Sequence, residues 1–228
     1  MIIYNSDCIE TLRKLSGEAR QIDAVLTDPP YCSCNKNGRG LTKYYEESTA
    51  AKMPPILCDD MSAHALILQT RLWMQLATSI MNPGGYFFCF SDFRQLATFT
   101  DLMEQSGIQH RGVIVWDKGN ARPQKGGFTQ STEFITWGTK GKPMSTAILP
   151  GLYRIAPYPQ KQRLHPAEKP VELLKNLLKM LPAGATVFDP FMGSGSTGQA
   201  ALESGMDFVG CELSPEYFAI AESRLDAI

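Results

Sequence analysis

The stretch "TVFDPFMGSGSTGQAALESGMDFVGCEL", residues 186–213, decides the fold. Its apolar start predicts a short strand that ends at Asp189, and the glycine-bearing turn after it leads into a predicted helix over 196–204. The apolar segment 208–212 predicts a second strand, which ends in an acid, Glu212. Strand, glycine turn, helix and strand in this order form a βαβ unit, from which parallel sheets are built.

The glycine turn is typical of a nucleotide-binding site. Glycines let the backbone approach a ligand closely, and the following helix presents free N–H groups to it. Glu212 comes nineteen residues after Gly193, at the end of the next strand, where an acid accepts hydrogen bonds from ribose hydroxyl groups. Gly193, Gly195 and Gly198 match the letters Gly-x-Gly-x-x-Gly, which alone is a weak signal. Asp189 suits a positively charged amino group, so S-adenosylmethionine fits this turn better than NAD.

Strand-like and helix-like segments alternate along the rest of the chain. The predicted strands are 1–4, 23–27, 86–90, 112–116 and 133–137. The predicted helices are 8–15, 63–81, 92–105, 169–181 and one that begins at Pro215 after a Ser214 cap. We expect Asn82-Pro83-Gly84-Gly85 to end the second helix, and 143–166, with its prolines, to be loop-rich. The alternation predicts an α/β fold with a mostly parallel sheet and helices on both faces, and 228 residues fit one domain.

Composition excludes several classes of protein. No apolar stretch approaches the roughly 20 residues of a membrane span, and the first residues do not form a secretory signal. The six cysteines are scattered and no Cys-x-x-Cys or zinc-ligand spacing occurs, so we expect reduced thiols, no metal and a cytoplasmic location. The net charge is −1, but residues 111–169 hold ten Lys and Arg against three acids. Such a basic middle suits a surface that faces a polyanion, although a merely solvated face would also explain it.

A second motif, Asp28-Pro29-Pro30-Tyr31, follows the predicted strand 23–27. Proline cannot donate to a sheet ladder, so the strand must end at Asp28. Together with the glycine turn and with His165-Pro166-Ala167-Glu168-Lys169-Pro170, this motif resembles the amino-DNA methyltransferases of the β class. In that family the catalytic motif precedes the cofactor motif, and the order is the same here. The resemblance covers nearly the whole chain and implies a Rossmann-like, circularly permuted methyltransferase fold.

The resemblance implies a catalytic role for the Asp28-Pro29-Pro30-Tyr31 motif. The exocyclic amino nitrogen of a base is a poor nucleophile, because its lone pair is delocalised into the ring. Asp28 is expected to accept one N–H of this group, and the Pro29 carbonyl the other, which aims the lone pair at the methyl group of the cofactor. Tyr31 is expected to stack on the base, which must be flipped out of the duplex.

The resemblance also implies the cofactor-binding residues. Glu212 is expected to bind the ribose, and Asp7 the adenine amino group, although Asp7 also fits a helix N-cap. Glu168 lies in the motif expected to close the cofactor pocket. The expected cofactor-binding residues are Asp7, Cys8, His165, Lys169, Asp189, Phe191, Gly193, Ser194, Gly195, Ser196, Thr197, Glu212 and Leu213.

The family methylates adenine at N6 or cytosine at N4. An acid in the first catalytic position favours adenine, so we expect an N6-adenine DNA methyltransferase, with an N4-cytosine enzyme as the alternative. An RNA adenine methyltransferase and a catalytically silent module that binds S-adenosylmethionine or DNA are further alternatives. An NAD-dependent oxidoreductase would not explain Asp28-Pro29-Pro30-Tyr31.

Target recognition is expected in a short, loop-rich insert at about 142–164, helped by a mobile loop or helical segment at about 32–62. We expect a short or relaxed target in double-stranded DNA and a possible homodimer, which the family often forms. The sequence does not tell whether a restriction partner exists. The residues expected to contact DNA are Lys36, Arg39, Lys118, Arg122, Lys125, Arg154, Lys161 and Arg163.

Overall fold

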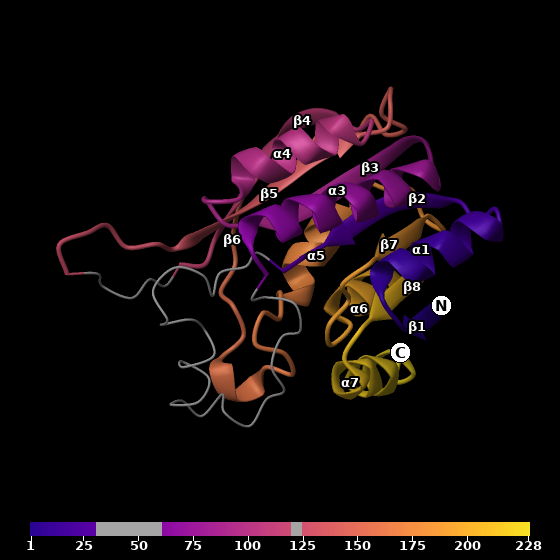
Figure 1. Ribbon diagram of the computed structural model, residues 1–228. Helices are drawn as coiled ribbons and strands as arrows, with labels where there is room; N and C mark the ends of the chain where they lie inside the picture. Colours follow the sequence, from indigo (N-terminus) through magenta and orange to yellow (C-terminus); the bar gives the residue numbers. More distant parts are fainter. Residues whose placement is uncertain (31–60, 120–124) are drawn as a thin grey trace.

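One eight-stranded sheet organises the chain (Figure 1). The structure is a computed structural model, and it describes residues 1–30, 61–119 and 125–228. The strands are, in their spatial order, β1 (Ile2–Asn5), β8 (Asp207–Glu212), β7 (Thr186–Asp189), β2 (Ile22–Thr27), β3 (Met81–Ser91), β5 (Thr132–Thr139), β4 (Gln109–Asp117) and β6 (Leu152–Arg154). The first five are parallel neighbours, and β5 runs antiparallel to both β3 and β4. The expected mostly parallel sheet is confirmed.

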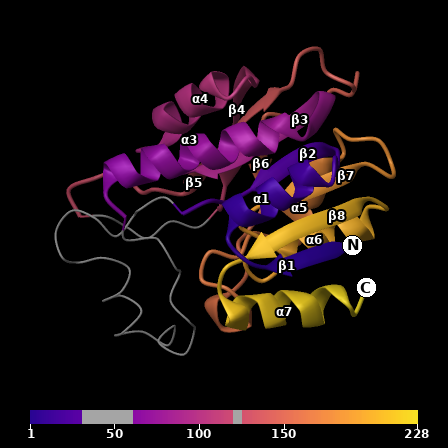
Figure 2. The ribbon, with the colours of Figure 1, turned by 45° about the vertical axis from the view of Figure 1, so that its right-hand side comes forward.

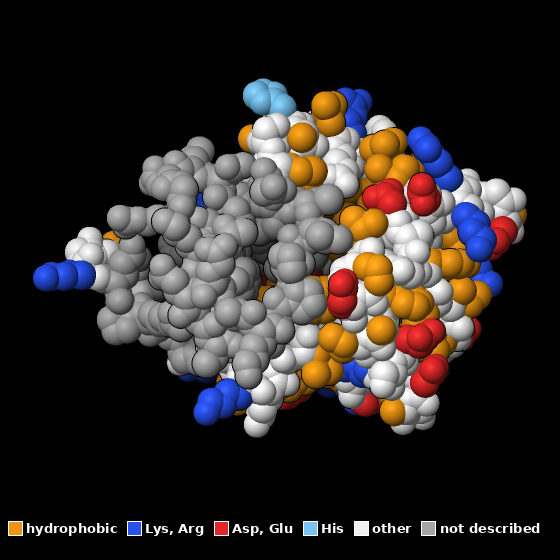
Figure 3. Space-filling view, turned by 60° about the horizontal axis from the view of Figure 1, so that its bottom comes forward, with side chains coloured by type: hydrophobic (Ala, Val, Ile, Leu, Met, Phe, Trp, Pro, Cys, Tyr) orange, Lys and Arg blue, Asp and Glu red, His pale blue; other side chains and the backbone are white. Residues whose placement is uncertain are grey.

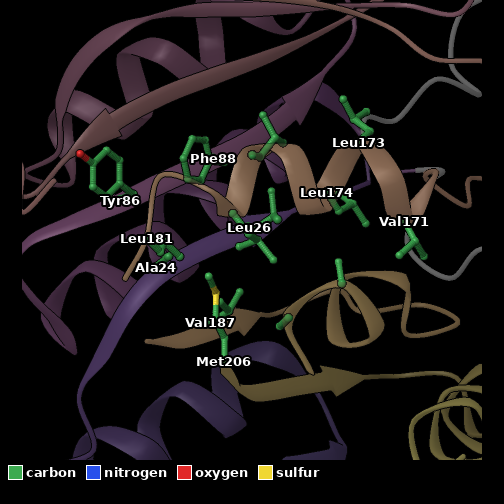
Figure 4. Packing of buried hydrophobic residues seen from close by; sticks show 14 of the residues in the cluster. Ala24, Leu26, Tyr86, Phe88, Val171, Leu173, Leu174, Leu181, Val187 and Met206 are labelled. Atoms are coloured by element: carbon green, nitrogen blue, oxygen red, sulfur yellow. The ribbon is translucent and has the colours of Figure 1, made fainter. Parts of the chain in front are cut away.

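Helices cover both faces of the sheet (Figures 1 and 2). The helices α1 (Cys8–Gly17), α3 (Ala63–Ser79) and α4 (Leu96–Gln105) pack on one face. The helices α5 (Val171–Leu178), α6 (Ser196–Glu203) and α7 (Pro215–Leu225) pack on the other. Successive strand residues point to opposite faces, so Phe87 and Phe88, both buried, belong to different cores. Figure 4 shows Leu173 and Leu174 of α5 in the same apolar layer as Leu26 of the sheet.

The helix starts agree with the capping residues in the sequence. The Asp7 carboxylate accepts a hydrogen bond from the Ile9 N–H at 2.8 Å, so Asp7 is the N-cap of α1. Ser214 caps α7, and Pro215 occupies its first turn, as predicted. Both caps lie directly after strands, and they fix where the chain leaves the sheet.

One expectation about local structure was wrong. Asn82-Pro83-Gly84-Gly85 does not form a separate turn between α3 and the next strand, because β3 already begins at Met81. The Gly84 N–H donates to the Lys140 carbonyl at 2.7 Å, and the pairing with β2 shifts register here, which accommodates the proline. The stretch 143–166 is loop-rich, as predicted, and also contains the short strand β6, parallel to β4, and the 3₁₀ helix η2 (Gln160–Gln162). Three residues are too few to show a strand period in a sequence.

Gly138 of β5 lies where the backbone of the neighbouring strand leaves no room for a side chain. A Cβ atom at this position would meet the Gln109 carbonyl oxygen at 2.5 Å. We therefore expect Gly138→Ala to lower the free energy of unfolding by about 1–3 kcal/mol, through backbone displacement. Urea unfolding, followed by circular dichroism, measures this free energy. Gly17→Ala is the matched control, since no atom outside its chain neighbours and its own helix backbone lies within 4 Å of its Cβ position. Equal stability of both variants would contradict this packing.

Candidate active site

Four acidic residues stand at the carboxyl ends of four parallel strands. Asp189 and Glu212 end β7 and β8, Asp28 follows β2, and Asp7 follows β1. Because these strands are neighbours in the sheet, their carboxyl ends meet at one edge. All four side chains line a single cavity of about 390 Å³. Residues that are far apart in the sequence are thereby collected in one pocket.

Most residues expected to act at the site line this cavity. They are Asp7, Cys8, Asp28, Pro29, Pro30, His165, Lys169, Asp189, Phe191, Gly193, Ser194, Ser196, Thr197, Glu212 and Leu213. Gly195 is not part of the lining and instead caps α6 with a left-handed backbone (φ +79°). Tyr31 lies outside the described residues.

The glycine turn holds Glu212 in place. One carboxylate oxygen of Glu212 accepts a hydrogen bond from the Gly193 N–H at 3.0 Å, and the other accepts one from the Ser214 N–H at 2.8 Å. Burial nevertheless raises the pKa of Glu212, since it disfavours the charged form. Gly198 in α6 packs against β8, where a Cβ atom would meet the Phe208 ring at 2.8 Å. The three glycines therefore serve the turn and the close approach of helix and strand.

Asp189 is the most deeply buried of the four acids, with 3% of its surface exposed. The Thr27 hydroxyl donates to its carboxylate at 2.8 Å, and the Phe191 N–H donates to the same oxygen at 3.0 Å. Burial outweighs these hydrogen bonds and raises the pKa of Asp189 to about 6. A carboxylate in this position gains from a positively charged partner.

Asp28 forms an ion pair with Lys169, whose side chain is 8% exposed. The Lys169 ammonium lies 3.5 Å from a carboxylate oxygen of Glu133 in β5, and Glu133 also pairs with Lys118 at 2.5 Å. The nearby carboxylates raise the pKa of Lys169 despite the opposing effect of burial, and the two lysines lower the pKa of Glu133. We call these residues, Asp28, Lys169, Glu133 and Lys118, the charge cluster.

The segment 165–169 forms one wall of the cavity. The His165 ring lies edge-on to Tyr217, with 4.3 Å between ring centroids, and its Nδ1 accepts a hydrogen bond from the Ala167 N–H. Burial, and next the charge of Lys169, lower the pKa of His165 to about 3, so this histidine is neutral near pH 7. The Glu168 carboxylate pairs with Arg224 of α7 at 2.9 Å. This ion pair ties the cavity wall to helix α7.

The residues expected to contact DNA do not form one patch. Lys118 points into the cavity as part of the charge cluster. Arg163 donates to the backbone carbonyls of Tyr158 and Pro166, and Arg154 pairs with Asp117 while most of its side chain stays exposed. Two more residues are exposed, Lys125 and Lys161. Three lie outside the described residues, Lys36, Arg39 and Arg122.

The sequence did not lead us to predict some residues of the site. Glu133 and Trp116 line the cavity and are register partners on β5 and β4, and Phe90 of β3 lies under Lys169. Arg224 holds Glu168 from the far end of the chain. Glu133 is the one acid between Asp117 and Glu168, a cue that was available in the sequence. No such cue pointed to Arg224, because a basic residue near the end of a helix is ordinary.

Comparison with known proteins identifies the family. The family model of N6/N4 DNA methylases matches residues 22–149 and 148–223. The chain belongs to this DNA methylase family. It is 28% identical to the type II methyltransferase M2.DpnII of Streptococcus pneumoniae over 253 residues, which cover all of this chain and 90% of the relative. It is 26% identical to M.HinfI of Haemophilus influenzae, over 99% of this chain and 68% of that protein.

Solved structures of methylases share the fold. The crystal structure of the M1.HpyAVI complex with S-adenosylmethionine superposes with a TM-score of 0.73 at 25% identity, over 98% of this chain and 99% of that one. The cytosine-N4-specific PvuII DNA methyltransferase superposes with a TM-score of 0.73 at 17% identity, over 97% and 85% of the two chains, which shows the fold alone.

The methylase is therefore an S-adenosylmethionine-dependent DNA methyltransferase. The cavity fits that cofactor, because its buried carboxylates match the hydroxyl and ammonium groups of the molecule. Each carboxylate oxygen of Glu212 has a further lone pair besides the one that binds the backbone. In the residues that the structure describes, no helix is long and apolar enough to cross a membrane.

The pair between Glu168 and Arg224 generates a prediction about stability. The Glu168 side chain is 2% exposed, so Arg224→Met would leave a buried carboxylate without its cationic partner. We expect this variant to lower the free energy of unfolding by about 3 kcal/mol. Arg94→Met, which breaks an ion pair whose arginine side chain is 50% exposed, is the matched control and should cost less than about 1 kcal/mol. Urea denaturation measures the free energy of unfolding of both variants. Similar losses in the two variants would refute a special role for Arg224.

Proposed function

We propose that this methylase transfers the methyl group of S-adenosylmethionine to the N6 amino group of an adenine flipped out of double-stranded DNA. The observation that carries the proposal is the position of Asp28 and Pro29. Both line the same cavity as Asp189 and Glu212. The proposed acceptor of the amino group and the acids proposed to bind the cofactor therefore lie in one cavity. The acid in the first catalytic position favours adenine over cytosine.

Asp28 and Pro29 supply two hydrogen-bond acceptors to the amino group of the base. A carboxylate and a backbone carbonyl together bind both N–H groups, and this draws the nitrogen toward tetrahedral geometry. Pro29 and Pro30 hold the acceptors rigidly at the end of β2. The nitrogen loses one proton when it is methylated, and Asp28 is the carboxylate beside it that can take this proton. Tyr31 is assigned to stacking on the base from the sequence motif.

The other acids of the cavity hold the cofactor. We assign Glu212 to the ribose hydroxyls, Asp7 to the adenine amino group and Asp189 to the ammonium group of the methionine part. The cap that Asp7 forms on α1 uses one of its oxygens, so both roles are compatible. When bound, S-adenosylmethionine supplies a methyl group activated by its sulfonium charge.

The DNA would approach over the carboxyl edge of the sheet, where the cavity lies. Figure 3 views the molecule from below Figure 1 and shows Lys and Arg side chains at the outer left of that face and again along its upper right, where acids also lie. We assign the exposed Lys125, Arg154 and Lys161 to phosphate contacts.

The first prediction of this function concerns the product. Purified methylase, incubated with S-adenosylmethionine and unmethylated duplex DNA, should form N6-methyladenine, measured by mass spectrometry of the nucleosides. Asp28→Ala should lower the yield at least about 100-fold, because one acceptor of the amino group is lost. N4-methylcytosine alone would reverse the base assignment, and no methylated base in DNA would direct the search to RNA.

The second prediction concerns the pH dependence of cofactor binding. Asp189, with its pKa raised to about 6, is ionised above that pH and neutral below it. A neutral carboxyl group loses its attraction to the cofactor's ammonium group. The dissociation constant measured by calorimetry should therefore rise about tenfold between pH 7.5 and pH 5.

Asp189→Asn is the matched control for this pH dependence. The amide oxygen can still accept the hydrogen bonds from Thr27 and Phe191, but it carries no charge at any pH. The variant should bind the cofactor more weakly at pH 7.5 and with no tenfold change on acidification. An unchanged pH dependence in this variant would assign the titration to another group, such as Glu212.

A further inference from the structure

The Lys169 ammonium group donates hydrogen bonds to the Asp28 carboxylate and, at 3.2 Å, to the Ala167 carbonyl. A carboxylate oxygen of Glu133 lies 3.5 Å from the same nitrogen as an ion-pair partner. The Phe90 ring lies on another side, with its centroid 5.1 Å from the nitrogen. Lys169 is thus held by contacts on several sides at the bottom of the cavity, and its charged partners are not the acids of the glycine turn.

The two negative and two positive charges of the charge cluster cancel. Asp28 and Glu133 are acids, Lys169 and Lys118 are bases, and the ion pairs join them in alternating order along the cavity lining. The exposed fractions of the side chains rise from 8% at Lys169 to 27% at Lys118. Without Glu133, a second lysine would stand near Lys169 with no intervening negative charge. Glu133 therefore separates the charges of the two lysines, in addition to its place in the strand pairing of β5.

We propose that Lys169 is a positioning residue for Asp28, and that Glu133 in turn fixes Lys169. The inference rests on the proposed role of Asp28 as acceptor of the base amino group. It also departs from the sequence motif, which places Lys169 with the cofactor. The carboxylate of Asp28 could otherwise rotate, and the ammonium group selects one orientation.

The backbone around Lys169 explains why this lysine is suited to the task. Pro170 follows it as the N-cap of α5, and Glu168 before it is tied to Arg224. The side chain therefore starts from a point fixed on both sides. A neighbouring cation also favours the ionised form of a carboxylate, which accepts hydrogen bonds with both oxygens and donates none. Lys169 thus acts on the reaction through Asp28 and does not itself contact the reacting atoms.

The test measures the single-turnover rate constant of DNA methylation at saturating cofactor, beside the dissociation constant of S-adenosylmethionine from calorimetry. Lys169→Met should lower the rate constant about 100-fold, as expected for a misplaced acceptor, and change the dissociation constant less than about threefold. Lys175→Met is the matched control. Lys175 lies in α5 and pairs with Glu203 at the surface, so its loss should leave both quantities unchanged.

Two further variants keep the test decisive if Lys169→Met folds poorly. Lys169→Arg keeps the positive charge and should recover at least about a tenth of the wild-type rate constant. Glu133→Gln removes the partner of Lys169 without changing its size, and should lower the rate constant about tenfold. Wild-type rate constants in Lys169→Met and Glu133→Gln, or a loss explained by weaker cofactor binding, would overturn the inference.

A double-variant comparison separates this inference from the proposed role of Asp28. In an Asp28→Ala background, adding Lys169→Met should lower the residual rate constant less than about threefold, because the side chain it positions has been removed. A full 100-fold further loss would show that Lys169 acts elsewhere. If Asp28→Ala itself kept the wild-type rate constant, the proposed role of Asp28 would fail, whatever Lys169 does.

Discussion

The site depends on the parallel pairing of β2 with β7. This pairing places Val25 opposite Phe188, and the residues that follow the two strands, Asp28 and the end residue Asp189, therefore come to the same edge. The hydrogen bond from Thr27 to Asp189 joins the two strands at that edge. The motif that begins at Asp28 and the glycine turn near residue 193 become neighbours without any direct chain connection. Their order in the sequence has no bearing on the chemistry, since only the sheet order brings them together.

Collecting four acids in one pocket carries an electrostatic cost, and each acid is compensated differently. Glu212 accepts hydrogen bonds from backbone N–H groups, and Asp7 accepts one from an N–H group in the first turn of α1. Asp189 accepts one from a hydroxyl group and one from an N–H group. Asp28 has a full positive charge beside it. Neutral donors stabilise a carboxylate but leave it attractive to a cation, which suits a residue that must bind a charged ligand. A lysine neutralises the carboxylate instead, which suits a residue that meets a neutral base.

Sequence reasoning reached the parts of the site that depend on local chemistry. A proline pair ends a strand, glycines form the turn, and an acid ends the next strand, so Asp28 and Glu212 could be placed at the sheet edge in advance. It did not reach Glu133 or Arg224, because their roles come from strand order and from a helix that packs over the turn. The register shift around Asn82–Gly85 was missed for a related reason. The hydrogen bond from Gly84 to Lys140 that holds it is made with a distant residue.

The antiparallel strand β5 gives the site its asymmetry. Its neighbours β3 and β4 flank it, and it brings Glu133 to the cavity opposite Trp116. The parallel strands β8 and β7 end in acids that accept hydrogen bonds from the glycine turn, whereas β5 carries the acid that faces Lys169. Under the roles proposed above, one side of the pocket holds the charged cofactor, and the other fixes the orientation of the Asp28 carboxylate. Asp28 lies where the two sides meet. A substitution at Glu133 on β5 should therefore alter methylation of the base, while the hydrogen bonds that hold the acids of the cofactor side stay in place.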